Sequence, residues 1–167
     1  MRTAYNSAMT TAESLKSRML QLGRHPAVSR AIRATVPLDK AVTRLSRGHV
    51  HLVPEALLPQ LTLTTVGRRS GVARSVPLLY VRDGKDFVVI ASNFGQQHHP
   101  AWSYNLESSP DAEVLLGTRR IPVRAKRMSE SDRKRLWPAI VEVWPAYDDY
   151  VVRAGNRRIK LYRLSPR

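Results

Sequence analysis

Short apolar segments recur through the second half of the chain and predict β-strands. Residues 61–66 alternate and are rich in Thr, Leu and Val, whereas residues 87–92 are continuously apolar, which is typical of a central strand. The other strand-like segments are residues 75–82, 113–116, 121–127 and 159–164. No repeated strand–helix–strand unit accompanies them, and no Rossmann glycine fingerprint is present. The pattern therefore predicts about six antiparallel strands.

Glycine-containing turns join these strands. Asp83-Gly84 and Gly117-Thr118 are typical of tight hairpin turns. The turn at residues 67–71 (GRRSG) differs because it is basic. Gly67 and Gly71 permit positive φ, so backbone N–H groups could line a small concavity there.

The basic turn is the most specific candidate for a binding site. Arg68, Arg69 and Arg74 can donate forked hydrogen bonds to phosphate or carboxylate oxygens. Arginines on a hairpin turn are, however, also commonly only solvated. On the residues alone, the turn is either an anion site or a solvated surface.

The first part of the chain predicts helices rather than strands. Apolar side chains recur at three- and four-residue spacing through residues 11–36, where His25-Pro26 divides the segment into two short helices. A further helix is expected over residues 38–47. The basic side chains of residues 11–36 would suit a helix on an anionic membrane, and packing on the barrel is the alternative.

Helix signals also occur in the connections between the later strands. Pro100 suits the first position of a short helix. Ser129 with Asp132 resembles a capping arrangement, and the aromatic segment WPAYDDY follows at residues 144–150. Together the elements predict an α+β fold, an antiparallel barrel with helices in its connections. We expect residues 1–53 to form a helical N-terminal extension or cover, and residues 54–167 to form the barrel domain.

Composition limits the function classes. The chain has 167 residues, no cysteine and a formal net charge of +15. Without cysteine there is no disulfide or thiolate chemistry, and no apolar run approaches the ~20 residues of a membrane span. The first residues lack a signal-peptide pattern, so we expect a cytoplasmic protein, with peripheral contact at the inner face of the membrane through the basic N-terminal helices.

The positive charge would attract nucleic acid, anionic lipid or a multiply charged cofactor. No aromatic residues interleave the arginines, as a stacking platform for single strands would require, so no specific nucleic-acid partner is expected.

Other chemistries find little support. His49 with His51, and the pair His98-His99, lack a carboxylate beside them, whereas zinc usually needs three or four ligands. No G-x-S-x-G nucleophile motif is present. Asp148-Asp149 are adjacent helix positions that do not face each other. We expect neither a metal site nor a hydrolase.

Three segments taken together resemble the deazaflavin-dependent nitroreductase family. They are GRRSGVARSVPLLYVRDG, VVIASNFGQQHHPAWSYNLESSPDAEV and LWPAIVEVWPAYDDY, and the likeness runs from Leu61 to the C-terminus. Members of that family are split-β-barrel reductases, of the FMN-binding split-barrel type, that use coenzyme F420. The resemblance implies an F420-dependent reductase, with FMN as the alternative cofactor.

The resemblance also implies a cofactor groove. Arg68, Arg69 and Ser70 would bind the phosphate and polyglutamate tail, with Arg74 supporting them. The residues expected along the deazaflavin ring belong to two strands: Ser75, Val76, Pro77, Leu78 and Leu79, and Ile90, Ala91, Ser92 and Asn93. The residues expected to complete the pocket, at the start of the Pro100 helix, are Ala101, Trp102, Ser103, Tyr104 and Asn105. For Trp102 and Asn105, packing and capping are the alternative.

For catalysis, the resemblance implies Tyr147 and Tyr150, with Ser92 beneath them and Tyr147 also against the cofactor. Hydride arrival builds negative charge on the acceptor, and a phenol of pKa near 10 remains a hydrogen-bond donor at neutral pH. The alternative is that both tyrosines are core residues. Trp144 and Leu79 stand where some relatives carry tyrosine, which implies a more apolar site.

The expected reaction is hydride transfer from reduced F420 to a small-molecule acceptor: a quinone, a nitroaromatic or an activated alkene. Two alternatives remain open, an FMN- or haem-binding barrel and a non-enzymatic basic module that binds nucleic acid or membrane. Since split barrels often pair, a homodimer is also expected.

Overall fold

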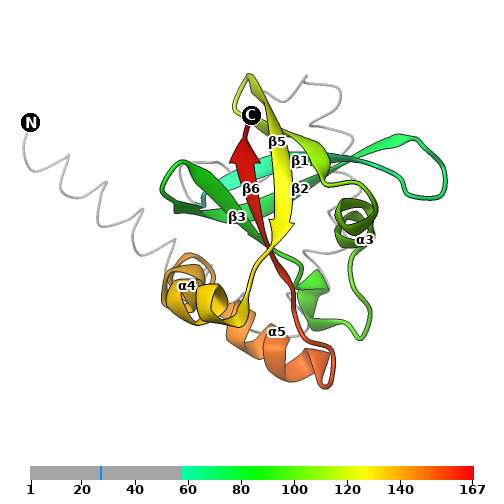
Figure 1. Ribbon diagram of the computed structural model, residues 1–167. Coiled ribbons are helices and arrows are strands. Elements are labelled where there is room, and N and C mark those ends of the chain that lie inside the picture. Colours follow the sequence, from blue (N-terminus) through cyan, green and yellow to red (C-terminus); the bar gives the residue numbers. More distant parts are fainter. Residues whose placement is uncertain (1–26, 28–57) are drawn as a thin grey trace, which may run out of the picture.

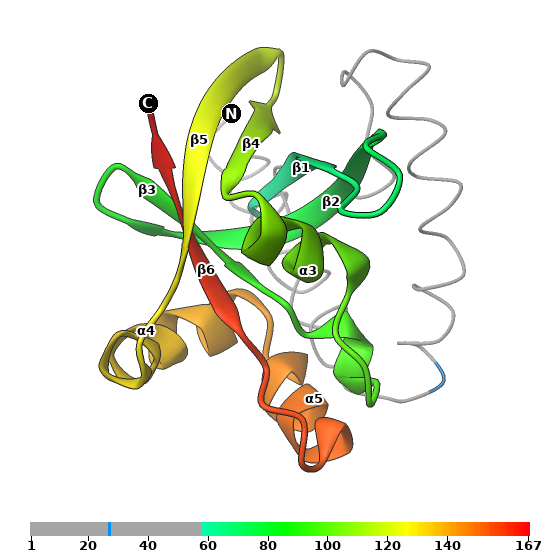
Figure 2. The same cartoon turned by 45° about the vertical axis from the view of Figure 1, so that its right-hand side comes forward.

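Figures 1 and 2 show the computed structural model of the chain, which describes residue 27 and residues 58–167. The N-terminal extension over residues 1–53, with its expected helices at 11–36 and 38–47, lies outside the described residues except for Ala27. His49 and His51 lie outside them as well. No helix among the described residues is both long and apolar enough to cross a bilayer.

The described strands close into an antiparallel barrel in the order β1-β2-β3-β6-β5-β4 (Figure 1). The strands are β1 (Gln60–Val66), β2 (Ala73–Asp83), β3 (Asp86–Ile90), β4 (Asp111–Leu116), β5 (Arg119–Arg127) and β6 (Leu161–Pro166). The predicted α+β antiparallel barrel is confirmed. Both tight hairpins are also present, since Asp83 pairs with Asp86 and Leu116 with Arg119.

The helices lie in the connections, as predicted. A 3₁₀ turn η1 (Asn93–Gly95) and helix α3 (Ala101–Ser108) follow β3, while α4 (Glu130–Val143) and α5 (Ala146–Ala154) link β5 to β6. Figure 1 shows α4 and α5 together at one end of the barrel, away from α3. The expected cap of α4 is confirmed, because the Ser129 hydroxyl accepts a hydrogen bond from the Asp132 N–H at 3.1 Å.

Strand β3 separates two cores. Phe87 and Val89 face the barrel interior, whereas Val88 and Ile90 face a second core that α4 and α5 cover. Because both faces of the strand are buried, its sequence is continuously apolar. The strand end that follows Ile90 therefore lies between the barrel and the helices.

The structure corrects several local predictions. Strands β2, β4 and β5 each begin two residues earlier than predicted. Pro100 is the N-cap of α3 with an extended ψ of 148°, so the helix begins one residue later. Strand β6 begins at Leu161, two residues later than predicted, and runs to Pro166. Of the two glycines in the basic turn, only Gly71 takes a positive φ, +66°. At Gly67 space is tight instead, because an added Cβ would lie 2.6 Å from Ser70 Oγ and 3.1 Å from the Val72 carbonyl oxygen.

Candidate functional site

The basic turn between β1 and β2 is a closed, hydrogen-bonded loop. The Gly67 N–H donates to the Val72 carbonyl at 2.9 Å, and the Gly71 N–H donates to the Gly67 carbonyl at 2.8 Å. Arg68, Arg69, Ser70 and Arg74 are exposed. Among the described residues, no carboxylate forms an ion pair with these arginines. The turn therefore presents positive charge to solvent.

Helix α3 holds this turn in place. The side-chain oxygen of Asn105 accepts from the Arg68 N–H at 3.1 Å, and its amide donates to Thr65 Oγ1 at 3.0 Å. The Arg68 guanidinium lies over the Tyr104 ring at 4.9 Å from its centroid. The structure thus brings the predicted tail-binding turn and the predicted α3 residues together. The buried Asn105 side chain positions the turn.

The other α3 residues divide by burial. Ala101 is exposed, whereas Trp102 is buried and packs edge-on against Tyr162 at 5.5 Å between ring centroids. The fully buried Ser103 hydroxyl donates to the Pro100 carbonyl at 2.9 Å. The side chains of Trp102 and Ser103 therefore contribute to packing and to the helix start.

Strand β2 continues from the turn with a half-buried apolar surface. The Ser75 and Thr64 hydroxyls are hydrogen-bonded across the strands at 2.8 Å. The next residues, Val76, Pro77, Leu78 and Leu79, are all half-buried. Because successive side chains of a strand alternate in direction, Val76 and Leu78 pack against the barrel core, whereas Leu79 packs against the helix-covered core.

The end of β3 lies beside the aromatic residues of α5. Ile90 belongs to the helix-covered core together with Tyr147 and Tyr150, whereas Ala91 faces the barrel interior. Ser92 and Asn93 follow, both half-buried, and Asn93 Nδ2 donates to the His98 carbonyl at 3.0 Å. The structure thus brings Ile90 and the two tyrosines into one cluster.

Both tyrosines of α5 are buried, at 5% and 2% exposure for Tyr147 and Tyr150. The Trp144 indole N–H donates to the Tyr150 hydroxyl at 3.2 Å. Burial, together with the neighbouring Tyr150, raises the pKa of Tyr147 above its ordinary value, so that its phenol stays protonated at neutral pH. Both tyrosines belong to the helix-covered core, as the core-residue alternative expects, so the protonated Tyr147 phenol can donate only to a group that reaches this core.

Comparison with known proteins places this arrangement in a family. The model of the F420H(2)-dependent quinone reductase family matches residues 38–162, about three-quarters of the chain. The chain belongs to this family. It is therefore an oxidoreductase enzyme, and the prediction of coenzyme F420 rather than FMN as cofactor is confirmed.

Individual relatives agree with the family match. The F420H(2)-dependent quinone reductase Rv1261c of Mycobacterium tuberculosis is 35% identical over 108 residues, 63% of this chain and 72% of that protein. A solved F420-H2 dependent reductase, FDR-A, is 29% identical with a TM-score of 0.60, covering 70% of this chain and 99% of that one. A domain-swapped dimer is 28% identical with a TM-score of 0.61, covering 77% and 99%.

One residue that the sequence did not single out is prominent in this F420-dependent reductase. Arg157, just after α5, donates to the carbonyl oxygens of Ser92 and Gln96 at 2.6 Å and of Ala91 at 3.1 Å. Its guanidinium also lies 3.3 Å from His99 Nδ1. Because the chain carries 28 lysines and arginines, the sequence offered no signal that set this one apart.

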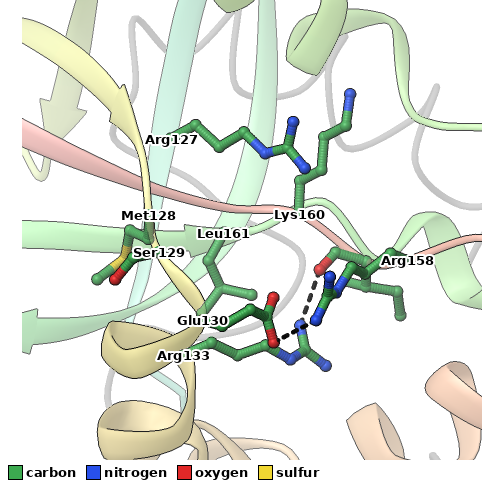
Figure 3. A pocket seen from close by; sticks show the side chains of 9 residues that line it. Arg127, Met128, Ser129, Glu130, Arg133, Arg158, Lys160 and Leu161 are labelled. Atoms are coloured by element: carbon green, nitrogen blue, oxygen red, sulfur yellow. Dashed lines mark hydrogen bonds and ion pairs between the residues drawn. The ribbon is translucent and has the colours of Figure 1, made fainter.

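A separate basic hollow lies between the start of α4 and the segment before β6 (Figure 3). Four cationic residues line it: Arg127, Arg133, Arg158 and Lys160. Arg158 pairs with Glu130 at 2.6 Å, and Arg133 donates to the Ile159 carbonyl at 2.7 Å. None of the predicted site residues lines this hollow.

Proposed function

We propose that this protein transfers a hydride from reduced F420 to a quinone. Two observations carry the proposal: the exposed basic turn is held against α3, and the tyrosines of α5 lie beside the end of β3. We infer that the cofactor binds between these two places, which we call the proposed groove. Bound F420 would supply the hydride from its deazaflavin ring. The chain would supply binding, orientation and hydrogen-bond donors.

The donor set of the turn fits the anionic tail of F420. Arg68, Arg69 and Arg74 are exposed, and the Ser70 hydroxyl lies on the same turn. The cramped space at Gly67 also matters, since an added Cβ would press on Ser70 and Val72 and open the loop. We infer that these residues bind the phosphate and carboxylates, with guanidinium forks on the oxygens.

The half-buried surface of β2 and the end of β3 would hold the flat ring. Residues 75–79 of β2 and residues 90–93 at the end of β3 would run along the ring. Part of this backbone is already used, since the Ala91 N–H donates to the Lys160 carbonyl and the Ala91 and Ser92 carbonyls accept from Arg157. The N-terminus of α3 at Ala101 would add free N–H groups near anionic atoms. Burial between these segments would exclude water from the reacting atoms.

The acceptor would lie near Tyr147, Tyr150 and Ser92. The raised pKa of Tyr147 keeps its phenol protonated, so it could stabilise the oxyanion of a half-reduced quinone carbonyl. Trp144 and Leu79 make this region apolar, which suits a lipid-soluble quinone. Nitroaromatics and activated alkenes are the other acceptors to test.

Two further parts of the proposal concern location and assembly. We propose that the protein is cytoplasmic and meets its quinone at the inner face of the membrane, through the basic residues 1–53. We also propose a homodimer, because the similar domain-swapped structure is a dimer. Analytical ultracentrifugation would measure the assembly, and flotation with anionic and neutral vesicles would measure the membrane contact.

The deciding experiment combines binding and turnover. Purified protein is titrated with F420 and, separately, with FMN, and oxidation of F420H2 is then followed against quinones, nitroaromatics and enones. The expected result is F420 binding with quinone-dependent oxidation. Tight FMN binding without F420 binding would overturn the proposal, and so would F420 binding with no acceptor reduced.

A further inference from the structure

We propose that Arg157 is a positioning residue that holds the segment between β3 and α3 (residues 91–99) in its working conformation. The inference rests on the proposed function, because this segment begins at the strand end assigned to the deazaflavin ring. Figure 2 shows the segment running beside α5, and Arg157 follows that helix in the chain. One side chain thus links the last helix to the proposed cofactor strand.

All three nitrogen atoms of the Arg157 guanidinium donate hydrogen bonds to backbone carbonyls. Nη2 donates to the Ser92 carbonyl at 2.6 Å, Nη1 to the Ala91 carbonyl at 3.1 Å, and Nε to the Gln96 carbonyl at 2.6 Å. These three carbonyls belong to the beginning and the end of one tight loop. A guanidinium can bridge them because its five N–H groups are fixed in a plane, whereas a lysine ammonium is a single point.

The loop needs such a constraint because its backbone is strained. Asn93 and Phe94 take φ values of 47° and 54°, and Gly95 follows at 75°. Left-handed conformations of non-glycine residues are disfavoured and persist where surrounding contacts hold them. Arg157 contacts the residues immediately before and after this run, so it contributes directly to that support.

Helix α5 supports the loop from the other side. A Cβ on Gly95 would lie 2.8 Å from Arg153 Cβ and 3.0 Å from the Tyr150 carbonyl, so the two backbones are in close contact. Phe94 packs edge-on against Tyr150 at 6.0 Å between ring centroids. The loop that Arg157 holds therefore also sets the position of Tyr150 relative to Ser92.

Arg157 uses its charge to bind backbone carbonyls of the loop and not a carboxylate among the described residues. Among the ion pairs of the described residues none involves Arg157, and burial lowers the pKa of its half-buried guanidinium. Its partners are carbonyl dipoles and the imidazole of His99, whose Nδ1 must accept because a guanidinium only donates. Arg157 thereby also selects the His99 tautomer that carries its proton on Nε2.

The test compares Arg157→Ala and Arg157→Lys with the matched control Arg158→Ala. Arg158 is the adjacent arginine, and its exposed side chain pairs only with Glu130 among the described acids. Three quantities are measured: amide hydrogen exchange of residues 91–96 in ligand-free protein, the F420 dissociation constant, and kcat with saturating F420H2. Each is repeated with added methylguanidinium, and urea unfolding reports the global stability.

We expect Arg157→Ala to speed exchange of the bonded amides of Ala91, Gly95 and Gln96 and to weaken F420 binding, each by about tenfold or more. Methylguanidinium should partly restore both, Arg157→Lys should restore neither, and Arg158→Ala should match the wild type. If Arg157→Ala does not fold, the loop exchange and F420 binding of Arg157→Lys are compared with those of the wild type and Arg158→Ala.

Unchanged loop exchange and binding in Arg157→Ala would overturn the inference, as would full function in Arg157→Lys or an equal loss in Arg158→Ala. Failure of the wild-type protein to bind F420 would instead contradict the proposed function. In that event the loop exchange still decides whether Arg157 positions the segment.

Discussion

At the scale of single residues, several side chains of the proposed site hold other residues in position. The sequence predicts Asn105 against the cofactor. In the structure its side chain instead accepts a hydrogen bond from the Arg68 N–H and donates one to Thr65. A buried amide that bonds two segments is costly to remove, because both partners lose a hydrogen bond. Its contribution to binding is therefore expected to be indirect.

Asn105→Ala should lower the free energy of unfolding by about 1–3 kcal/mol, since it leaves the buried Thr65 hydroxyl and the part-buried Arg68 N–H without this partner. It should also weaken F420 binding by releasing the basic turn. Urea unfolding and F420 titration measure the two effects. Asn156→Ala, at an exposed asparagine, is the control, and an equal effect of the two substitutions would contradict the role of Asn105.

Gly95 matters for a different reason: the backbone of its loop packs directly against the backbone of α5 at this position. Gly95→Ala combines a positive φ of 75° with a Cβ only 3.1 Å from Tyr150 Cα. Gly84→Ala is a matched control, because its φ is 62° and nothing lies within 4 Å of its Cβ. We expect Gly84→Ala to cost about 1–2 kcal/mol of stability from φ alone and Gly95→Ala distinctly more. Equal thermal shifts would show that the loop moves away from α5 freely.

At the scale of elements, an ionic network ties the β2–β3 hairpin to α4 and β6. Asp83 accepts from Arg135 at 2.8 and 2.9 Å and from Arg163 at 2.8 Å. These hydrogen bonds, led by Arg135, lower the pKa of Asp83 to about 2, although partial burial opposes them. The network joins elements that are 52 and 80 residues apart in the chain.

The sign of the pH dependence follows from this shift. A carboxylate with a depressed folded-state pKa contributes stability above its unfolded value near 3.8, and that stability is lost as pH falls toward 2. Asp83→Asn should therefore be less stable than the wild type at pH 6, with the difference disappearing between about pH 4 and pH 2. Urea unfolding across this range measures it. Asp111→Asn, at a half-exposed carboxylate that pairs with Arg124 and Arg167, should show little change. A pH-independent difference for Asp83→Asn would contradict the linkage.

The same scale shows what the sequence could predict. Strands, hairpins and the α4 cap follow from local rules, so β3 and Ser129 were recognised from apolar pattern and spacing. The network of Asp83 and the clamp of Arg157 depend on contacts between distant segments, which no local pattern encodes. The motif resemblance implied which residues form the site, and the structure shows that the Asn105 side chain forms hydrogen bonds within the protein.

At the scale of the whole molecule, the net charge of +15 raises a question of specificity. Any polyanion would be attracted to such a chain, so weak binding of F420 alone would not locate the site. In the proposed groove, the arginines lie together on a turn that α3 holds in place. A charge-matched comparison can separate local recognition from general attraction.

Replacing Arg68 and Arg69 with alanine should raise the F420 dissociation constant by about 10–100-fold, the loss of one or two charge-assisted contacts. Turnover at saturating F420H2 should change little, because the proposed chemistry lies at the other end of the groove. The control replaces Arg119 and Arg120, two exposed arginines of the β4–β5 hairpin, and removes the same charge. An equal loss of binding in the control would mean that net charge alone attracts the cofactor. If turnover fell while binding stayed intact, the basic turn would instead lie at the reacting end, and the two ends of the groove would have to be exchanged.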